Sequence, residues 1–544
     1  MTRADLDGTG RLVRLALRRD RVQLPIWLVA LTATQALSVQ SVLDLYPTPE
    51  ELHTFAVSSA KSPVVLATNG LVSGDTAGAV LASQTLLLIA IGAALMSTLL
   101  VVRHTRQEEE TGRAEMVRAA VVGRYAMLTA ALIVALGTNV ALGVLNVLVL
   151  VGLGLPTGGS VALGAAIAAV GIVFAGVGAV TAQVTEGARA ANGLAGASLG
   201  LAVLLRALGD VASTITEGGV RVDSSWPSWL SPVGWAEQIR PYDDNAWWVL
   251  ALLGIAFVVA AGSAYVLSSR RDLAAGLLPT RPGPATAPRA LLSPIGFAWR
   301  LQRGLLLGWS VALALLGLSY GAIGNDVDDL VGTSQGTADI LTKLGGGTAD
   351  LVDVWFSAVL GLMAIAVAAY AVQAVLRLHV EESSGRLEPV LATAVSRSRW
   401  LLAHLLIVVV GVIVLFVLTG AATGLAYAIV AGDGSQIGRL TAAALVRVPS
   451  ALLVAGLAVA VFGAVPSVAV GAAWGALAAF LFLAQLGVFL DLPQLLLDLS
   501  PFAHVPAAPV AQVTTAPLVW LVVGAILLTT VGTWAFRRRD VPAS

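Results

Sequence analysis

Long apolar runs recur along the whole chain, and each is long enough to cross a lipid bilayer as a helix. A hydrocarbon core about 30 Å thick needs roughly 20 apolar residues of helix. Hydrophobic residues make up 57% of the 544 positions and charged residues only 12%, about half the charged share of a soluble globular protein. The sequence therefore predicts an all-α polytopic membrane protein with about 12 transmembrane helices. The predicted spans are residues 24–43, 81–102, 125–153, 161–183, 190–211, 246–268, 304–323, 353–376, 400–430, 439–463, 467–489 and 516–535.

Arginine is concentrated on one side of the predicted membrane. Most arginines lie in the tails or in loops on the same side as the N-terminus, including the runs 11–21 and 537–539, whereas Lys61 and Lys343 lie on the opposite side. Basic residues next to spans remain in the cytoplasm. We therefore expect a multi-pass protein with both termini cytoplasmic. No small-residue cleavage site follows the Arg-rich start, so we also expect this segment to be retained as an anchor.

A charged segment after the second span has a second copy after the eighth span. Glu108-Glu109-Glu110-Thr111-Gly112-Arg113-Ala114-Glu115 corresponds to Glu381-Glu382-Ser383-Ser384-Gly385-Arg386-Leu387-Glu388. Further matched pairs are Val122-Gly123-Arg124 with Val395-Ser396-Arg397, Ser231-Pro232 with Ser500-Pro501, and Arg270-Arg271-Asp272 with Arg538-Arg539-Asp540. These landmarks predict two parallel six-helix repeats, residues 1–272 and 297–540, because an inverted repeat needs an odd number of spans per half. Residues 273–296 are rich in Pro, which cannot continue a helix, and form a predicted cytoplasmic linker.

Each half has a predicted helix before its first span and an apolar external loop before its last span. Residues 11–18 alternate apolar and basic side chains at roughly helical spacing, which predicts a helix in the cytoplasmic membrane interface. Its counterpart is 297–306. The loops 212–245 and 490–515 are rich in Pro and apolar residues, so we expect them to dip into the outer leaflet or to cap the bundle.

The repeated acidic segment predicts a short amphipathic helix at each of two cytoplasmic loops, near residues 106–123 and 379–396. The acidic pair can continue the preceding helix, and Gly112 or Gly385 then ends it. Apolar residues recur downstream every three or four positions, which is typical of an amphipathic helix. The alternative interpretation is a solvated connector. Two copies that keep the Glu pair, Gly-Arg and Glu in register favour a functional role.

The sequence offers no site for catalysis on this chain. Lys61-Ser62 is the one Lys-Ser or Lys-Thr dipeptide, but Ala-Val-Ser-Ser-Ala precedes it where a phosphate-binding loop needs glycine. The chain contains no cysteine, and its five histidines are scattered without metal-ligand spacing. We therefore predict no catalytic residue, no metal, no cofactor bound by this chain and no nucleic-acid partner.

The second acidic segment resembles the cytoplasmic loop of ABC-2 type exporter permeases. Residues 381–397, Glu-Glu-Ser-Ser-Gly-Arg-Leu-Glu-Pro-Val-Leu-Ala-Thr-Ala-Val-Ser-Arg, have the acidic pair, Gly, Glu and Ser-Arg end that bracket the coupling helix there. The tandem, Arg-rich and Cys-free chain resembles actinobacterial exporters of polyketide antibiotics or multiple drugs. The likeness covers the whole chain in layout and about 17 residues per half in motif. The first copy departs from the pattern: Arg118 replaces Leu391, Ala120 replaces Thr393 and Gly123 replaces Ser396.

This resemblance implies a permease subunit in the bacterial plasma membrane that exports lipophilic drugs or antibiotics. A separate ATP-binding-cassette ATPase, in two copies per permease chain, would bind ATP and Mg and dock under the two coupling helices. The implied ATPase-coupling residues are Glu108, Glu109, Gly112, Arg113, Glu115, Arg124, Glu381, Glu382, Gly385, Arg386, Glu388 and Arg397.

In such a fold the second and fifth spans of each half line the substrate path. An apolar aromatic wall with isolated amides suits a bulky amphipathic small molecule, although the same stripe could simply pack helices together in the lipid. The candidate path residues are Gln84, Met96, Gln373, Trp474, Phe482, Gln485 and Phe489.

Several polar residues fall inside predicted spans, where they are costly. Arg206 and Asp210 are four residues apart and are expected to pair along one helix. For Arg447 we expect a buried pair with a neighbouring span, with contact to an acidic substrate group as the alternative. Asn139 and Asn146 are expected to hydrogen-bond between helices.

Three other functions stay open. A proton-coupled secondary multidrug transporter would need acidic residues in mid-membrane, and no convincing one is present. A polytopic membrane enzyme acting on lipid would concentrate its acids and histidines in one large loop. The third is a sensor module that signals antibiotic presence to a partner.

Overall fold

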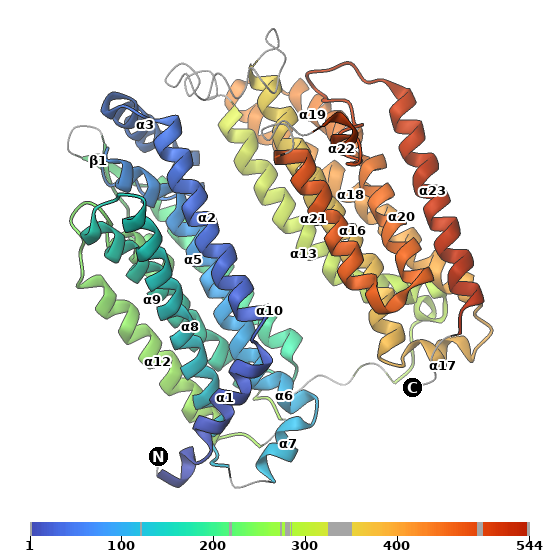
Figure 1. The fold of residues 1–544 in the computed structure, drawn as a ribbon, viewed down its shortest axis with the longest axis horizontal. Helices are drawn as coiled ribbons and strands as arrows, with labels where there is room; N and C mark the ends of the chain where they lie inside the picture. Colours follow the sequence, from blue (N-terminus) through green and yellow to red (C-terminus); the bar gives the residue numbers. More distant parts are fainter. Residues whose placement is uncertain are drawn as a thin grey trace. The chain divides into compact units, whose positions relative to one another are not determined.

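The computed structural model describes residues 3–119, 122–216, 220–272, 275–277, 283, 285–324, 351–486 and 493–540. In this part of the chain the protein is helical apart from a two-stranded antiparallel hairpin (Figure 1). Twelve helices are long and apolar enough to cross a membrane, and each overlaps one predicted span. The predicted all-α polytopic fold is therefore confirmed.

The chain divides into two compact units, with the boundary between Pro282 and Gly283. Unit 1 contains η1 (Arg3–Leu6), α1 (Thr9–Arg19), α2 (Gln23–Leu45), α3 (Pro49–Lys61), α4 (Pro63–Thr68), α5 (Ala77–His104), α6 (Arg106–Glu110), α7 (Arg113–Arg118), α8 (Ala126–Gly152), α9 (Thr157–Val184), α10 (Ala188–Val211), β1 (Thr214–Thr216), β2 (Arg221–Asp223), η2 (Ser228–Leu230), α11 (Pro232–Glu237) and α12 (Val249–Ser269).

Unit 2 has the same order of long helices in its described residues. It contains η3 (Arg289–Leu292), α13 (Pro294–Ile323), α16 (Leu351–Ser383), α17 (Leu387–Leu391), α18 (Arg397–Ala431), α19 (Ser435–Leu445), α20 (Val448–Ala464), η5 (Pro466–Val468), α21 (Ala469–Leu486), α22 (Gln494–Leu497) and α23 (Thr515–Arg538).

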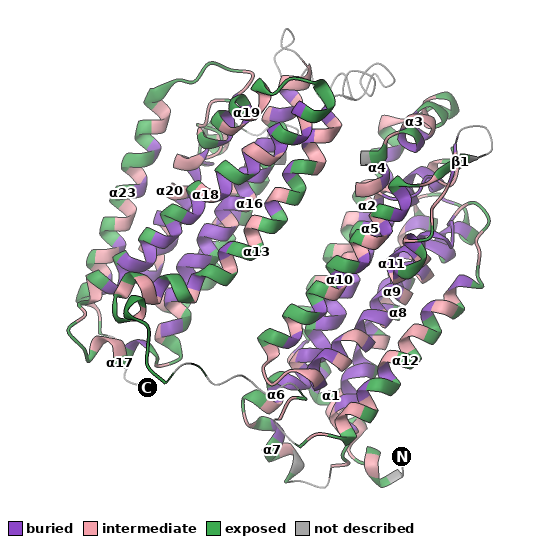
Figure 2. Cartoon of the chain, turned by 180° about the vertical axis from the view of Figure 1, so that it is seen from behind, coloured by how far each residue is buried: buried purple, intermediate pink, exposed green. Residues whose placement is uncertain are grey.

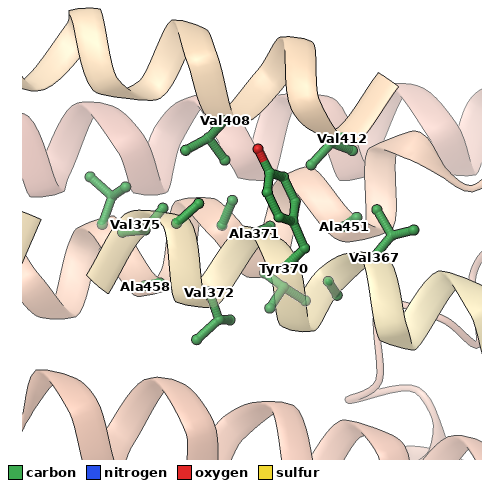
Figure 3. Close-up of a cluster of buried hydrophobic side chains, with 14 of the residues drawn as sticks. Val367, Tyr370, Ala371, Val372, Val375, Val408, Val412, Ala451 and Ala458 are labelled. Carbon is green, nitrogen blue, oxygen red and sulfur yellow. The ribbon is translucent and has the colours of Figure 1, made fainter. Parts of the chain in front are cut away.

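The second span of each unit is its central helix. The apolar windows of α5 and α16 are each 72% buried, compared with 17% for α2 and 11% for α23, and Figure 2 shows the buried residues gathered along α5, α9 and α16. Small residues allow this close approach in lipid. Gly411 of α18 is one example, because an added Cβ there would lie 2.0 Å from the hydroxyl of Tyr370 on α16. Figure 3 shows the Tyr370 ring between Val408, Val412 and the α16 backbone.

The structure corrects two predicted helix boundaries. Residues 297–306 do not form a separate interfacial helix as α1 does, because α13 runs without a break from Pro294 to Ile323. The predicted span 439–463 is two helices, α19 and α20, and Pro449 in the first turn of α20 explains the break.

The loop 212–245 of unit 1 packs on its helices, which agrees with the capping alternative of the prediction. Its η2 packs on α10, and α11 packs on α9, α10 and α12, while Trp226 remains 73% exposed. In unit 2, Phe502 packs against the core and Leu495 of α22 is exposed. Among the predicted positions, Lys343, Leu492 and Phe489 lie outside the described residues.

Candidate functional site

The two acidic segments fold in the same way locally. In unit 1, α6 carries the acidic residues, Gly112 adopts a left-handed φ of 72° and α7 follows. In unit 2, α16 continues through the acidic pair, Gly385 has a φ of 71° and α17 follows. The predicted break at each glycine is present, because this backbone region favours a residue without Cβ. The helices α7 and α17 are shorter than the ranges predicted for the two cytoplasmic-loop helices, 106–123 and 379–396.

The second glutamate of each pair holds the arginine at the end of the last span in its unit. In unit 1 the guanidinium of Arg271 donates two hydrogen bonds to Glu109, of 2.7 and 2.8 Å. In unit 2 Arg539 donates two to Glu382, of 2.5 and 2.6 Å. Both glutamate side chains are buried, with 7% and 6% exposed. A bidentate Arg–carboxylate pair fixes geometry as well as supplying energy, so each acidic loop is fastened to its sixth span.

The first glutamate of each pair contacts the arginine that follows the glycine. Arg113 lies 3.8 Å from Glu108, and Arg386 lies 3.1 Å from Glu381. The other partner of this glutamate differs between the units. Arg19 of α1 donates a 2.6 Å hydrogen bond to Glu108, whereas Glu381 is paired with Arg377 of its own helix. The loop of unit 1 is therefore also tied to the N-terminal helix.

The arginine that ends each segment binds the carboxyl end of the same last span. Arg124 donates hydrogen bonds to the carbonyls of Ser268 and Ser269, at 3.2 and 2.9 Å. Arg397 donates to the carbonyl of Arg539 at 2.6 Å. A cation is favourable at this end, where carbonyls lack intrahelical donors and the helix dipole is negative.

A buried arginine reinforces the loop of unit 1. Arg106 is 0% exposed. It donates to Glu109 at 2.8 Å, to the carbonyl of Ala182 at 2.8 Å and to that of Ala275 at 3.1 Å. Glu110 accepts a 2.9 Å bond from the backbone N–H of Ala188, the first residue of α10. These bonds link the loop to α9, to α10 and to the chain after α12.

The turn between α1 and α2 is held by charges as well. Asp20 is buried and pairs with Arg103 at 3.0 Å and with His104. Burial raises the pKa of Asp20, but the hydrogen bond from His104 and the charges of His104, Arg103 and Arg19 lower it overall. The carboxylate is therefore ionised at neutral pH, and its pairs with Arg103 and His104 hold the turn between α1 and α2 against the end of α5.

The acidic pairs face inward, whereas α7 and α17 present other residues outward. Met116 is 70% exposed, and Glu115 beside it is also exposed. On the second loop Glu388 and Pro389 are exposed, while Leu387 is buried in the core. In each unit, a partner at the loop would meet the exposed residues of α7 or of α17 rather than the glutamate pair.

The candidate path residues are dispersed. Met96 is 2% exposed and belongs to the core of unit 1. Gln373 accepts a 2.9 Å hydrogen bond from the indole of Trp309. Trp474 and Phe482 are exposed on α21. Gln84 is half-buried on α5. The backbone of Gln485 lies in the last turn of α21, its side chain lies outside the described part of the chain, and Phe489 lies outside it altogether.

The polar residues inside the spans partly follow the predictions. Arg206 pairs with Asp210 as expected, at 2.7 Å. For Arg447 the prediction is a buried pair with a neighbouring span, and its guanidinium does bond the carbonyl of Ser357 on α16 at 3.0 Å. Its other described carbonyl partners are Ala443 and Ala508, at 2.7 and 3.0 Å. Its position beside the α19–α20 break explains this, because a broken helix leaves carbonyls without donors.

The two asparagines of α8 differ. Asn139 donates a 2.7 Å hydrogen bond to Ser97 of α5, which confirms the predicted link between helices. Asn146 bonds only the Leu142 carbonyl of its own helix among its described contacts, so the prediction for it is wrong. One turn of helix places the Asn amide within reach of the carbonyl four residues earlier.

Glu237, which lies 3.2 Å from Arg206, is not among the residues predicted from the sequence, and neither are the roles of Arg271 and Arg539. The two arginines were visible as a matched landmark near the end of each half, so that signal could have identified them. No repeated motif marks Glu237. Among the described residues, no group of three His, Cys, Asp or Glu could hold a metal ion.

Residues 291–537 match the family model described as the C-terminal domain of the multidrug efflux system permease Rv1217c. The whole chain is similar to the multidrug efflux system permease protein Rv1217c of Mycobacterium tuberculosis (strain ATCC 25618 / H37Rv). The two are 41% identical over 539 residues, which is 98% of this chain and 95% of that protein.

Proposed function

Since this chain belongs to the Rv1217c family of multidrug efflux system permeases, we propose that it is the membrane subunit of an ATP-driven exporter. In this proposal a separate ATP-binding-cassette ATPase supplies the hydrolysis, with one copy under each acidic loop. The membrane subunit moves lipophilic, polyketide-like drugs out of the cell. Twelve apolar helices support the permease role, and the words "efflux system" in the relative's name support a further component.

The observation that carries the proposal is the clamp that recurs in both units. Glu109 with Arg271, and Glu382 with Arg539, join each loop to the last span of its unit. A force applied to α7 or α17 would therefore be transmitted to the transmembrane helices through buried bidentate ion pairs. Two loops joined to their last spans in the same way suit two copies of one ATPase. In this view the exposed surfaces of α7 and α17 receive the ATPase, and the glutamates position those helices without touching the partner.

The arrangement at the loops is unequal, which has a functional consequence. The loop of unit 1 is also tied to α1 through Arg19 and to the start of α10 through Glu110. The first glutamate of unit 2 is held by its own helix. We infer that the ATPase under unit 1 moves a larger assembly of helices than the ATPase under unit 2.

Acidic substitutions on the exposed loop faces test the proposal. Met116→Glu on α7 and Ala392→Glu at the end of α17 place a charge on each surface without removing a clamp. We expect either change to weaken co-purification of a co-expressed ATP-binding-cassette ATPase and to lower its drug-stimulated hydrolysis. The matched control is Thr54→Glu, an exposed position on α3, which should leave both readouts unchanged.

Two results would contradict the coupling role. One is normal ATPase binding and stimulation in the Met116→Glu, Ala392→Glu double variant. The other is dye export by vesicles that contain this chain, a proton gradient and no ATPase. The second result would favour the proton-coupled secondary transporter.

A further inference from the structure

At the end of unit 1 opposite the acidic loop, one buried arginine lies between two buried acids. Arg206 and Asp210 on α10 are both 0% exposed, and the side chain of Glu237 at the end of α11 is 4% exposed. Nε of Arg206 lies 2.7 Å from Asp210 and 3.2 Å from Glu237. The guanidinium also donates to the carbonyls of Leu66 and Ala67, at 2.6 and 3.1 Å. The cluster thus joins α4, α10 and α11.

The cluster has one negative charge in excess if both acids are ionised. α11 packs on α5, α9, α10, α12 and η2, and the sequences of α9, α12 and η2 contain no ionisable charge. Arg103 and His104 of α5, and Arg189 of α10, lie at the acidic-loop end of those helices. Arg240, close to Glu237 in sequence, is paired with Asp223 and Asp244. No second cation of these elements therefore balances the cluster.

The hydrogen bonding points the same way as the charge. Oδ1 of Asp210, both carboxylate oxygens of Glu237 and Nη1 of Arg206 are buried without a hydrogen bond of ordinary geometry in the described residues. Nε of Arg206, 3.2 Å from Oε1 of Glu237, is already hydrogen-bonded to Asp210. A buried carboxylate without donors is strongly unfavourable. Two carboxyl groups can hydrogen-bond to each other only when one of them carries a proton.

We propose that the Arg206–Asp210–Glu237 cluster is a proton-binding site in which the two acids share one proton. The shared proton supplies the missing donor and cancels the excess charge, and the cluster then holds α4 and α11 on α10. When the proton leaves, an unbalanced carboxylate remains in a buried site and this contact weakens. The inference concerns unit 1 alone and does not depend on the coupling to an ATPase.

The surroundings fit a proton and exclude a drug. A pocket with about 10 Å³ of free space adjoins Glu237 and is lined by Asn69, Gly70, Ser73 and Ser83, among others. That space approaches the minimum for one water molecule, so protons can exchange there but no bulky ligand fits. Gly70 shapes the wall, since its φ is 130° and an added Cβ would lie 2.6 Å from Oε1 of Glu237.

Desolvation is the main influence on the titration of Glu237. Burial raises the pKa of Glu237 well above its ordinary value, the charge of Arg206 lowers it, and the charge and hydrogen bond of Asp210 raise it again; the Leu71 backbone lowers it least. A raised folded-state pKa gives stability that is fully present below the ordinary carboxyl pKa. That stability is lost as the pH rises through the folded-state value.

The described part of unit 2 has no counterpart of this cluster. The segment after Ser500-Pro501, the counterpart of Ser231-Pro232, has no Asp or Glu through residue 515, and α21 has no charged residue. Arg447 binds the carbonyl of Ala508 in that region instead. Proton binding at this end would therefore act on one unit only.

The test uses the full-length permease alone in lipid nanodiscs. Infrared spectra in the carboxyl C=O region should show a buried protonated carboxyl at about pH 7 that is absent in Glu237→Gln. The wild-type melting temperature should fall between about pH 5 and pH 8, and this fall should be smaller in Glu237→Gln. The control Glu50→Gln, exposed on α3, should behave as wild type.

Three outcomes would overturn the inference. The carboxyl band could persist unchanged in Glu237→Gln, or the wild type could show no such band at neutral pH. Alternatively, adding Na⁺ or K⁺ at fixed pH could raise the melting temperature as acid does, which would assign the site to a metal cation. If Glu237→Gln fails to fold, Asp210→Asn must remove the same band.

Discussion

Removing the carboxylate of Glu109 should release the acidic loop of unit 1. Glu109 accepts hydrogen bonds from Arg271 and Arg106, and both arginines and the glutamate are almost fully buried. Removing one partner of a buried ion pair costs about 3–5 kcal/mol. We expect the lower end of this range for Glu109→Gln, because Arg271 keeps Gln183 as a 2.7 Å partner and Arg106 keeps two carbonyls.

The consequence can be measured as local opening. A loss of about 3 kcal/mol raises the open population of the loop about 100-fold, since each 1.4 kcal/mol is a factor of ten. Hydrogen exchange of the amides in α6 and α7 reports this opening when reclosing is fast. The matched control is Glu115→Gln, an exposed glutamate of the same loop, for which we expect a change within about 0.5 kcal/mol.

A double-mutant cycle isolates the contact itself. Glu109→Gln, Arg271→Gln and their combination should be clearly non-additive, because the two side chains share one interaction. The reasoning fails if Glu109→Gln and Glu115→Gln accelerate exchange equally. It also fails if the two single effects simply add, since the bidentate pair would then contribute nothing of its own.

Three further changes have defined expected outcomes. Glu382→Gln should cost the second loop about 3–5 kcal/mol, at least as much as Glu109→Gln costs the first, because the guanidinium of Arg539 has no other hydrogen-bond partner in the described residues; exchange in α17 checks this. Tyr370→Phe should raise the free energy of unfolding by up to about 1 kcal/mol, because the buried hydroxyl has no hydrogen-bond partner in the described residues. A lower melting temperature of this variant in calorimetry would mean that the hydroxyl does have a hydrogen-bond partner. Gly112→Ala should cost the loop about 1 kcal/mol through its left-handed backbone, while Gly112→Asn should cost less, and equal exchange in both variants would argue against backbone strain.

The helices of this protein were largely predictable because their driving force is local. A run of about 20 apolar residues must satisfy every backbone polar group inside itself when it lies in lipid. Each predicted span therefore overlaps one of the twelve apolar helical segments of the described residues, and the boundary errors fall where a local competitor acts. Pro449 broke one predicted span, and the absence of a breaker after Pro294 joined two predicted elements into α13.

The acidic loops were predictable as a motif, but not in the roles of their residues. Repetition marked Glu109 and Glu382 as significant and placed glycine at the break. It did not show that both side chains turn inward to Arg271 and Arg539. Those arginines are more than 150 positions away along the chain, and no spacing rule connects residues at that separation.

Hydropathy and internal repetition can be read along the chain, so the amino-acid sequence was enough to predict a membrane protein, its number of spans and the positions of two matched polar segments. The pairing of charges depends on the folded arrangement of the helices. That arrangement fastened each loop to its last span and gave Arg206 a second acid in Glu237. A buried charge takes its partner from whichever residues the packing of distant helices brings within about 3 Å, and that information lies in the assembled fold rather than in any segment of the chain.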